Sequence, residues 1–144
     1  MKLAPNFTLE EFLVSQEGAR RGLDNTPDAD ALDNLRILAS TLQGVRNFLG
    51  HPIIITSGYR SPDINRLVGG SPTSAHLLGL AADFTCPGYG APLDVARAIG
   101  HQWGLRWDQI IYEYRSWVHL SVDPRYRRQT LTIDRNGTRQ GLVP

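Results

Sequence analysis

A long amphipathic helix is the strongest structural signal in this sequence. Within residues 30–49, apolar side chains recur at steps of three and four, which is the spacing of a single helix face. These positions are Leu32, Leu35, Leu38, Ala39, Leu42, Val45, Phe48 and Leu49. Gly50 ends the pattern, and residues 52–56 follow it as a run rich in β-branched side chains that predicts a buried strand. The fold must therefore combine this helix with a sheet.

Shorter elements surround this helix and strand. Thr8 and Glu11 form a capping-box pattern that predicts a helix over residues 9–17. Further helices are predicted over residues 62–68 and 93–102, and further strands over 80–85, 109–112, 117–122 and 129–133. Because helices come first and short strands cluster late with hairpins, we predict an α+β fold. It should have a small antiparallel sheet with helices packed around it.

The composition is that of one ordinary globular domain. The chain has 144 residues, of which 41% are hydrophobic and 20% charged, and we expect one domain over residues 1–134 with a C-terminal tail over 135–144. A net charge of +1 argues against a nucleic-acid partner, and the short basic cluster at 125–128 is interpreted as a solvated turn.

The N-terminal residues lack a long apolar segment, so we predict no signal peptide, no membrane span and synthesis in the cytoplasm. Cys86 is the only cysteine, so no intrachain disulfide can form.

Asp83 is the residue whose position asks for a chemical explanation. It lies inside the apolar run of a predicted strand, and burying a carboxylate is costly unless a partner compensates its charge. His76 precedes it by seven residues, and His119 lies in a later strand on the same face as Trp117 and Ser121. Two imidazoles and one carboxylate are the ligand set of a catalytic zinc site, although such ligands also suit other divalent ions. On this pattern alone, histidines that simply pack in the core or lie on the surface remain an alternative.

Glu113 and Arg60 are the further candidates for catalysis. Glu113 ends a predicted strand that a hairpin joins to the strand of His119, so it could act as a general base beside a metal. The alternative is a solvent-facing residue at a sheet edge. Arg60 follows a strand and a glycine, where a fixed guanidinium could grip a substrate carboxylate or a developing oxyanion. The alternative for Arg60 is an ordinary surface arginine or one that holds its own loop.

Five motifs in one order give the sequence a family resemblance. They are SGYRS, N-x-x-V-G-G, S-A-H-x-x-G-x-A-A-D-F, a strand that ends in Glu, and W-V-H-x-S. Together they resemble the zinc D-Ala-D-Ala carboxypeptidase family of peptidoglycan peptidases, and most of all its short single-domain members that phages often encode. The N-terminal T-L-E-E-F and G-L-D-N-T-P are also similar to that subgroup, so the likeness runs from about Phe7 to Val122. The resemblance implies a D-Ala-D-Ala carboxypeptidase/hedgehog-like α+β fold.

The resemblance also implies a metal site and a catalytic base. It implies one Zn²⁺ per chain, held by His76, Asp83 and His119. Many relatives have an acidic residue three positions before the last histidine, where this chain has Ser116. The similar subgroup uses a glutamate at the end of the preceding strand, and we therefore assign the base role to Glu113.

The resemblance implies a substrate cleft as well. Arg60 and Ser74 would lie near the substrate, while Trp117 and Tyr59 could form walls for an alanyl methyl group or could be plain core aromatics. The implied partner is a peptidoglycan peptide, and we expect a monomer that acts at the bacterial cell wall through phage-type delivery, as an endolysin or a virion-associated hydrolase.

The reaction implied is zinc-dependent hydrolysis of a peptide bond in the stem or cross-link of the cell wall. A D-Ala-D-Ala carboxypeptidase and an L-Ala-D-Glu type endopeptidase both satisfy the sequence, and the depth of the pocket beyond Arg60 would separate them. A non-catalytic zinc-binding module of the cell wall or of a phage, with the same fold, is the alternative of another class. A regulatory zinc protein is a third, in which Cys86 would be the fourth ligand.

Overall fold

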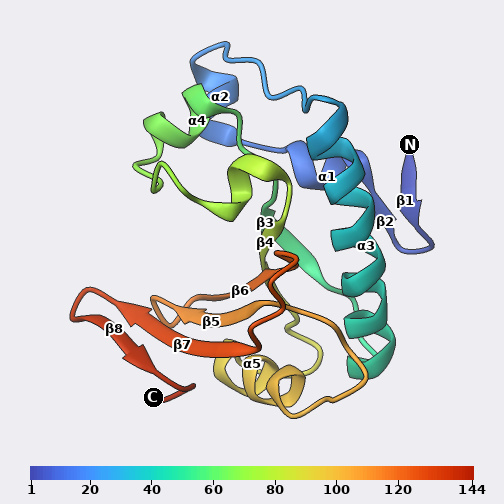
Figure 1. Cartoon of the computed structure of the whole chain (residues 1–144), viewed down its shortest axis with the longest axis vertical. Coiled ribbons are helices and arrows are strands. Elements are labelled where there is room, and N and C mark those ends of the chain that lie inside the picture. The colour runs from blue at the N-terminus through green and yellow to red at the C-terminus, as the bar shows by residue number, and fades with distance from the viewer.

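The long helix forms one side of the molecule in the computed structural model, which describes residues 1–144 (Figure 1). This helix is α3, Ala29–Leu49, and its buried side chains repeat at the predicted spacing. Asp28 caps its N-terminus by accepting a hydrogen bond from the backbone N–H of Ala31 at 2.8 Å. Gly50 ends it in the left-handed conformation, at φ 74°, which glycine adopts without steric cost. No helix combines the length and the apolar composition that a membrane crossing requires.

Six strands form the main sheet, in the order β3-β4-β6-β5-β7-β8. Their bounds are Ile54–Ser57 for β3, Ala81–Thr85 for β4, Gln109–Glu113 for β5, Trp117–Ser121 for β6, Gln129–Asp134 for β7 and Gly137–Gln140 for β8. Neighbouring strands are antiparallel except β5 and β7, which run parallel. The sheet is therefore mixed, and the prediction of a purely antiparallel sheet was wrong at this pair. The reason is that residues 122–128 carry the chain back to the start of β5 before β7 begins.

The expected C-terminal tail contains strand β8. It forms an antiparallel hairpin with β7, with Asp134 opposite Gly137. Gly137 has φ 107°, and the N–H of Asn136 donates to Oδ1 of Asp134 at 2.8 Å. A short loop that contains Asn and Gly between two strands is typical of a hairpin, so the local sequence did contain this signal.

The remaining elements are short. They are β1 Lys2–Ala4, β2 Phe7–Thr8, α1 Leu9–Leu13, α2 Gln16–Arg20, α4 Pro62–Leu67, α5 Pro92–Gly100 and a 3₁₀ helix, η1, Ala75–Leu78. The N–H of Thr8 donates to Glu11 at 2.9 Å, as the capping-box pattern predicts. The helix predicted over residues 9–17 is split into α1 and α2, because Val14 is extended and Ser15 starts a new helix by accepting from the N–H of Gly18 at 3.1 Å.

The hydrophobic core joins α3 and α5 to one face of the sheet. Helix α5 contacts α3, β5 and β6, and the core includes Leu38 of α3, Ile99 of α5, Phe84 of β4 and Leu120 of β6. Neighbouring residues along a strand point to opposite faces. The side chains next to Phe84 and Leu120 in sequence therefore project from the face of the sheet that the core leaves open.

Candidate metal centre

Asp83 and His119 lie opposite each other on neighbouring strands. They are register partners in the antiparallel pair of β4 and β6, which brings their side chains together on the sheet face away from the core. Nδ1 of His119 donates to Oδ1 of Asp83 at 3.0 Å, and the two residues are only 8% and 7% exposed. The strand pairing alone thus joins two of the proposed ligands.

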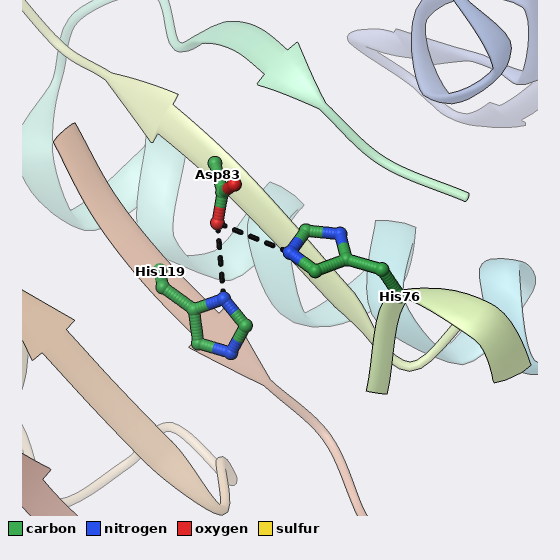
Figure 2. A group of neighbouring side chains, drawn as sticks. All are labelled: His76, Asp83 and His119. Carbon is green, nitrogen blue, oxygen red and sulfur yellow. Dashed lines mark hydrogen bonds and ion pairs between the residues drawn. The ribbon is translucent and has the colours of Figure 1, made fainter. Parts of the chain in front are cut away.

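His76 reaches the same point from η1 (Figure 2). Its Nδ1 lies 2.7 Å from the carbonyl oxygen of Gly58, and a carbonyl can only accept, so this nitrogen carries the proton. Nε2 then turns a lone pair towards Oδ1 of Asp83, 3.3 Å away. Two lone pairs at this separation repel each other unless a proton or a cation lies between them. The tautomer of His76 therefore favours a cation at this position.

Gly79 ends η1 and brings it close to the long helix. It has φ 72°, and a Cβ atom there would lie 2.6 Å from the carbonyl oxygen of Ala31 in α3. Only glycine tolerates both the positive φ and the close approach to this carbonyl oxygen. The glycine three residues after His76 therefore anchors the short helix that presents the imidazole.

The donor set fits a zinc ion. One ligand atom from each of His76, Asp83 and His119 lies within 4.8 Å of the others, and all three residues are buried. This is the only group of three histidine, cysteine or acidic residues in the chain that is placed to hold a metal ion. Cys86 is not part of it, because this residue is buried in the core and its thiol points to the carbonyl oxygen of His51. The closed site that Cys86 would complete in a regulatory zinc protein is therefore not formed.

The cluster keeps its carboxylate ionised. Burial by itself raises the pKa of Asp83, but the hydrogen bond from His119 and the neighbouring imidazole of His76 outweigh it, and the pKa lies well below its ordinary value. Burial lowers the pKa of His119, and the hydrogen bond and charge of Asp83 more than reverse this, so that its pKa is raised. A buried negative charge between two imidazoles attracts a cation, which agrees with the donor set.

Glu113 lies beside this cluster without being one of the three. It is the register partner of Trp117 across the tight turn between β5 and β6, and its Oε1 accepts a hydrogen bond from Nε1–H of Trp117 at 3.0 Å. The same oxygen is 3.8 Å from Nδ1 of His119. Glu113 is thus placed where a carboxylate could exchange a proton with a group bound next to the three proposed ligands.

The turn that positions Glu113 has an unusual backbone. In the three-residue loop between Glu113 and Trp117, Tyr114 and Arg115 both have positive φ, 52° and 57°, which is disfavoured for residues other than glycine, asparagine and aspartate. The N–H of Tyr114 donates to the carbonyl oxygen of Ile133 on β7 at 2.8 Å. The sheet thus holds the strained turn in place.

The three proposed ligands lie in a cleft of about 720 Å³. Arg60, Ser74, Glu113 and Trp117 line it, as the sequence-based assignment requires. Tyr59 does not, because it is 6% exposed and packs in the hydrophobic core. Of the residues proposed to contact substrate, Tyr59 is therefore the one that the fold does not bring to the cleft.

Arg60 is held at one wall of the cleft. Its backbone N–H donates to the carbonyl oxygen of His76 at 3.1 Å, and its Nη2 donates to Oγ of Ser74 at 3.2 Å. Burial lowers the pKa of its guanidinium, and the charges of Asp83 and Glu113 act in the opposite direction. Its Nε is buried without a hydrogen-bond partner. Arg60 therefore combines a fixed position with donors that the protein does not use.

Asp108 and Arg127 are cleft residues that the sequence patterns missed. Both line the cleft, and the guanidinium of Arg127 donates to both carboxylate oxygens of Asp108, with the closest contact at 2.7 Å. Asp108 is 1% exposed, so this pair is no solvated turn. The two residues are 19 positions apart, and no local periodicity links them.

The chain matches the protein-family model described as peptidase M15 over residues 5–121. The matched segment contains all the motifs described above, including the three proposed ligands and Glu113. No curated protein sequence matches the chain.

Proposed function

The chain belongs to the peptidase M15 family, whose members are zinc peptidases, and from this premise we propose that it cuts a peptide bond of bacterial peptidoglycan. The bond would lie in the peptide stem or in the cross-link between stems, and the site of action would be the bacterial cell wall. The observation that carries the proposal is the convergence of His76, Asp83 and His119 in one cleft, with Glu113 beside them.

The three converging side chains would hold the metal. A zinc ion bound there would supply Lewis acidity, which polarises a carbonyl group and makes a water molecule more acidic. His76 is oriented for this role by its bond to Gly58, and such outer hydrogen bonds fix the ring and its tautomer.

Glu113 would act as general base and then as general acid. Its carboxylate would take a proton from the attacking water and deliver it to the nitrogen of the leaving amine. Trp117 ties down Oε1 through its indole N–H, and no side chain or backbone group of the protein donates to Oε2. Oε2 therefore keeps both of its lone pairs free to accept a proton.

Arg60 would stabilise negative charge on the substrate. Its guanidinium is held by Ser74 and can donate to a substrate carboxylate or to the oxyanion that develops at the scissile carbonyl. Trp117, which lines the same cleft, would supply an apolar wall. The occupants of this cleft would thus be short peptides with an anionic group near the scissile bond.

The test uses purified murein. The wild-type protein should release new amino groups from it, and Glu113→Ala should keep its zinc and lose roughly a hundredfold or more in rate. Glu10→Ala is the matched control, because Glu10 is exposed and pairs only with the N-terminal ammonium group. A wild-type protein that co-sediments with murein, binds zinc and releases no amino groups would instead be a non-catalytic binding module.

A further inference from the structure

A second hollow meets the cleft at Arg60 and Val68. It measures about 500 Å³ and is lined by residues 14–17, by residues 55–57 of β3, and by Arg60 and Val68. The same Arg60 and Val68 also line the cleft that holds the proposed ligands. We call this second hollow the β3 groove. The two hollows are neighbours that share a wall.

One side of the β3 groove is the free edge of the sheet. Strand β3 is the outermost strand and pairs only with β4. The hydroxyl of Thr56 is used towards β4, where it donates to the carbonyl oxygen of Asp83 at 3.2 Å. The outward backbone N–H and C=O groups of β3 have no strand beyond them. An extended peptide can add to such an edge through main-chain hydrogen bonds.

The other walls of the β3 groove expose apolar side chains. Val14 is 63% exposed and Val68 is 42% exposed, so both present apolar surface to solvent. Val14 owes its exposure to the extended break between α1 and α2 that the Ser15 cap creates. Apolar contacts on either side of a polar strand edge suit a peptide, whose side chains alternate about its backbone.

The position of Arg60 bears on the kind of peptidase. A carboxypeptidase acts on the last bond of a chain, so its substrate ends at the cation that holds the terminal carboxylate. Here the surface stays hollow on the far side of Arg60, along β3. Only a substrate whose peptide chain continues past Arg60 could occupy the hollow at this point.

We infer that the β3 groove binds the part of a peptide substrate that extends past Arg60, so that the protein cuts internal bonds and is an endopeptidase. This inference rests on the proposed function. The occupant is an extended peptide chain that lies along β3, with an apolar side chain between Val14 and Val68.

The product identifies the bond that is cut. The wild-type protein should be given a muropeptide with a complete, uncross-linked stem and, separately, a cross-linked dimer, with the products identified by mass spectrometry. Cleavage of internal bonds without release of single D-alanine from the uncross-linked stem is the expected result. Release of the terminal D-alanine as the main product would overturn the inference while leaving the proposed function intact.

Filling the groove gives a second test. Val14→Trp places a large side chain in the β3 groove at an exposed position, and kcat/KM for the internal bond should fall by roughly tenfold or more. Ile37→Trp is the matched control, because Ile37 is 49% exposed on α3 and lines neither hollow. Equal kcat/KM values for the two variants would contradict the binding of the substrate in the β3 groove.

Failure of the proposed function has a different signature. If the zinc-loaded protein cuts neither muropeptide, the same dimer can be added to ¹⁵N-labelled protein and the backbone amide signals followed by NMR. Shifts at Thr56 and Ser57 would support an occupied β3 edge without any turnover. Shifts confined to residues of the cleft, such as Ser121 and Gln109, would rule out peptide binding in the groove.

Discussion

At the scale of single residues, the contact between Trp117 and Glu113 connects packing to chemistry. The indole N–H donates to the carboxylate at 3.0 Å, and the ring of Tyr114 lies against the indole with centroids 5.7 Å apart. Glu113 is thereby held next to His119 in a single orientation. A base that is fixed before substrate arrives loses less entropy in the transition state than a mobile one.

Trp117→Phe should therefore lower kcat. The phenyl ring keeps most of the packing but cannot donate a hydrogen bond, and a hydrogen bond to a charged group contributes about 1.5–3 kcal/mol, which corresponds to roughly a tenfold or greater loss of rate. Zinc content should not change. Trp103→Phe is the control, since Trp103 is 85% exposed and lies outside the cleft. A rise in KM with unchanged kcat would show that Trp117 acts only as a wall for substrate.

Removal of a ligand tests the metal centre itself. His119→Ala should abolish zinc binding, because two remaining ligands do not make a protein zinc site and metal affinity depends on the full donor set. Metal content measured by mass spectrometry should drop from about one zinc per chain to a trace. His101→Ala, at the exposed end of α5, should keep the metal. Equal zinc contents in the two variants would place the metal elsewhere.

At the scale of elements, the β5–β6 hairpin aligns Glu113, Trp117 and His119 within one short segment. The hairpin depends on a turn that contains Tyr114 and Arg115, both in the left-handed region. Such a conformation costs about 1–2 kcal/mol for a residue with a side chain. The cost is tolerated because the turn sets the register of Glu113 opposite Trp117.

Arg115→Gly should stabilise the protein. Glycine adopts φ 57° without steric cost, and after the entropy that it loses on folding the net gain should be about 0.5–1 kcal/mol. Urea unfolding measures the change. The same substitution at Arg21, where φ is −94°, should destabilise the protein, since no strain is relieved there. Destabilisation by both substitutions would mean that the turn is not strained.

At the scale of the whole molecule, the pair of Asp108 and Arg127 ties the late part of the chain to the sheet. Arg127 lies near the end of the connection that returns the chain to β5, and both its backbone N–H and its guanidinium donate to Asp108. Burial raises the pKa of Asp108, but the hydrogen bonds from Arg127 outweigh this effect and the pKa is lowered. The pair therefore stabilises the parallel arrangement of β5 and β7.

Stability should depend on pH through this pair. A lowered pKa in the folded state means that the stabilisation is complete above the ordinary value of 3.8 and is lost as the pH falls through the lower folded value. Asp108→Asn should therefore lower the free energy of unfolding by about 2 kcal/mol near neutral pH. The difference from wild type should shrink below about pH 4.

The measurement is urea unfolding at a series of pH values. Asp63→Asn is the control, because Asp63 and Arg66 form an exposed pair on α4, and exposed pairs contribute little. A difference between Asp108→Asn and wild type that stays constant with pH would contradict the assignment.

Local patterns were sufficient for the parts of this protein that depend on a few neighbouring residues. The spacing of apolar residues predicted α3. Alternation placed His119 on the strand face of Trp117 and Ser121, the carboxylate of Asp83 in an apolar run called for a partner, and the residue types themselves suggested a metal. Helix periodicity, caps and strand alternation act over a few positions, so they can be interpreted before the chain is folded.

Contacts between distant segments required the tertiary structure. The parallel pairing of β5 with β7, the Asp108–Arg127 pair and the burial of Tyr59 each depend on how whole elements pack. The β3 groove has the same origin, because its walls come from three separate segments of the chain. Residues far apart in sequence meet only when the core has closed, since burial of apolar area is non-directional and many arrangements of the same elements satisfy the local patterns. The ligands of the proposed metal could thus be named from the sequence, whereas the shape of the site around them came from the fold.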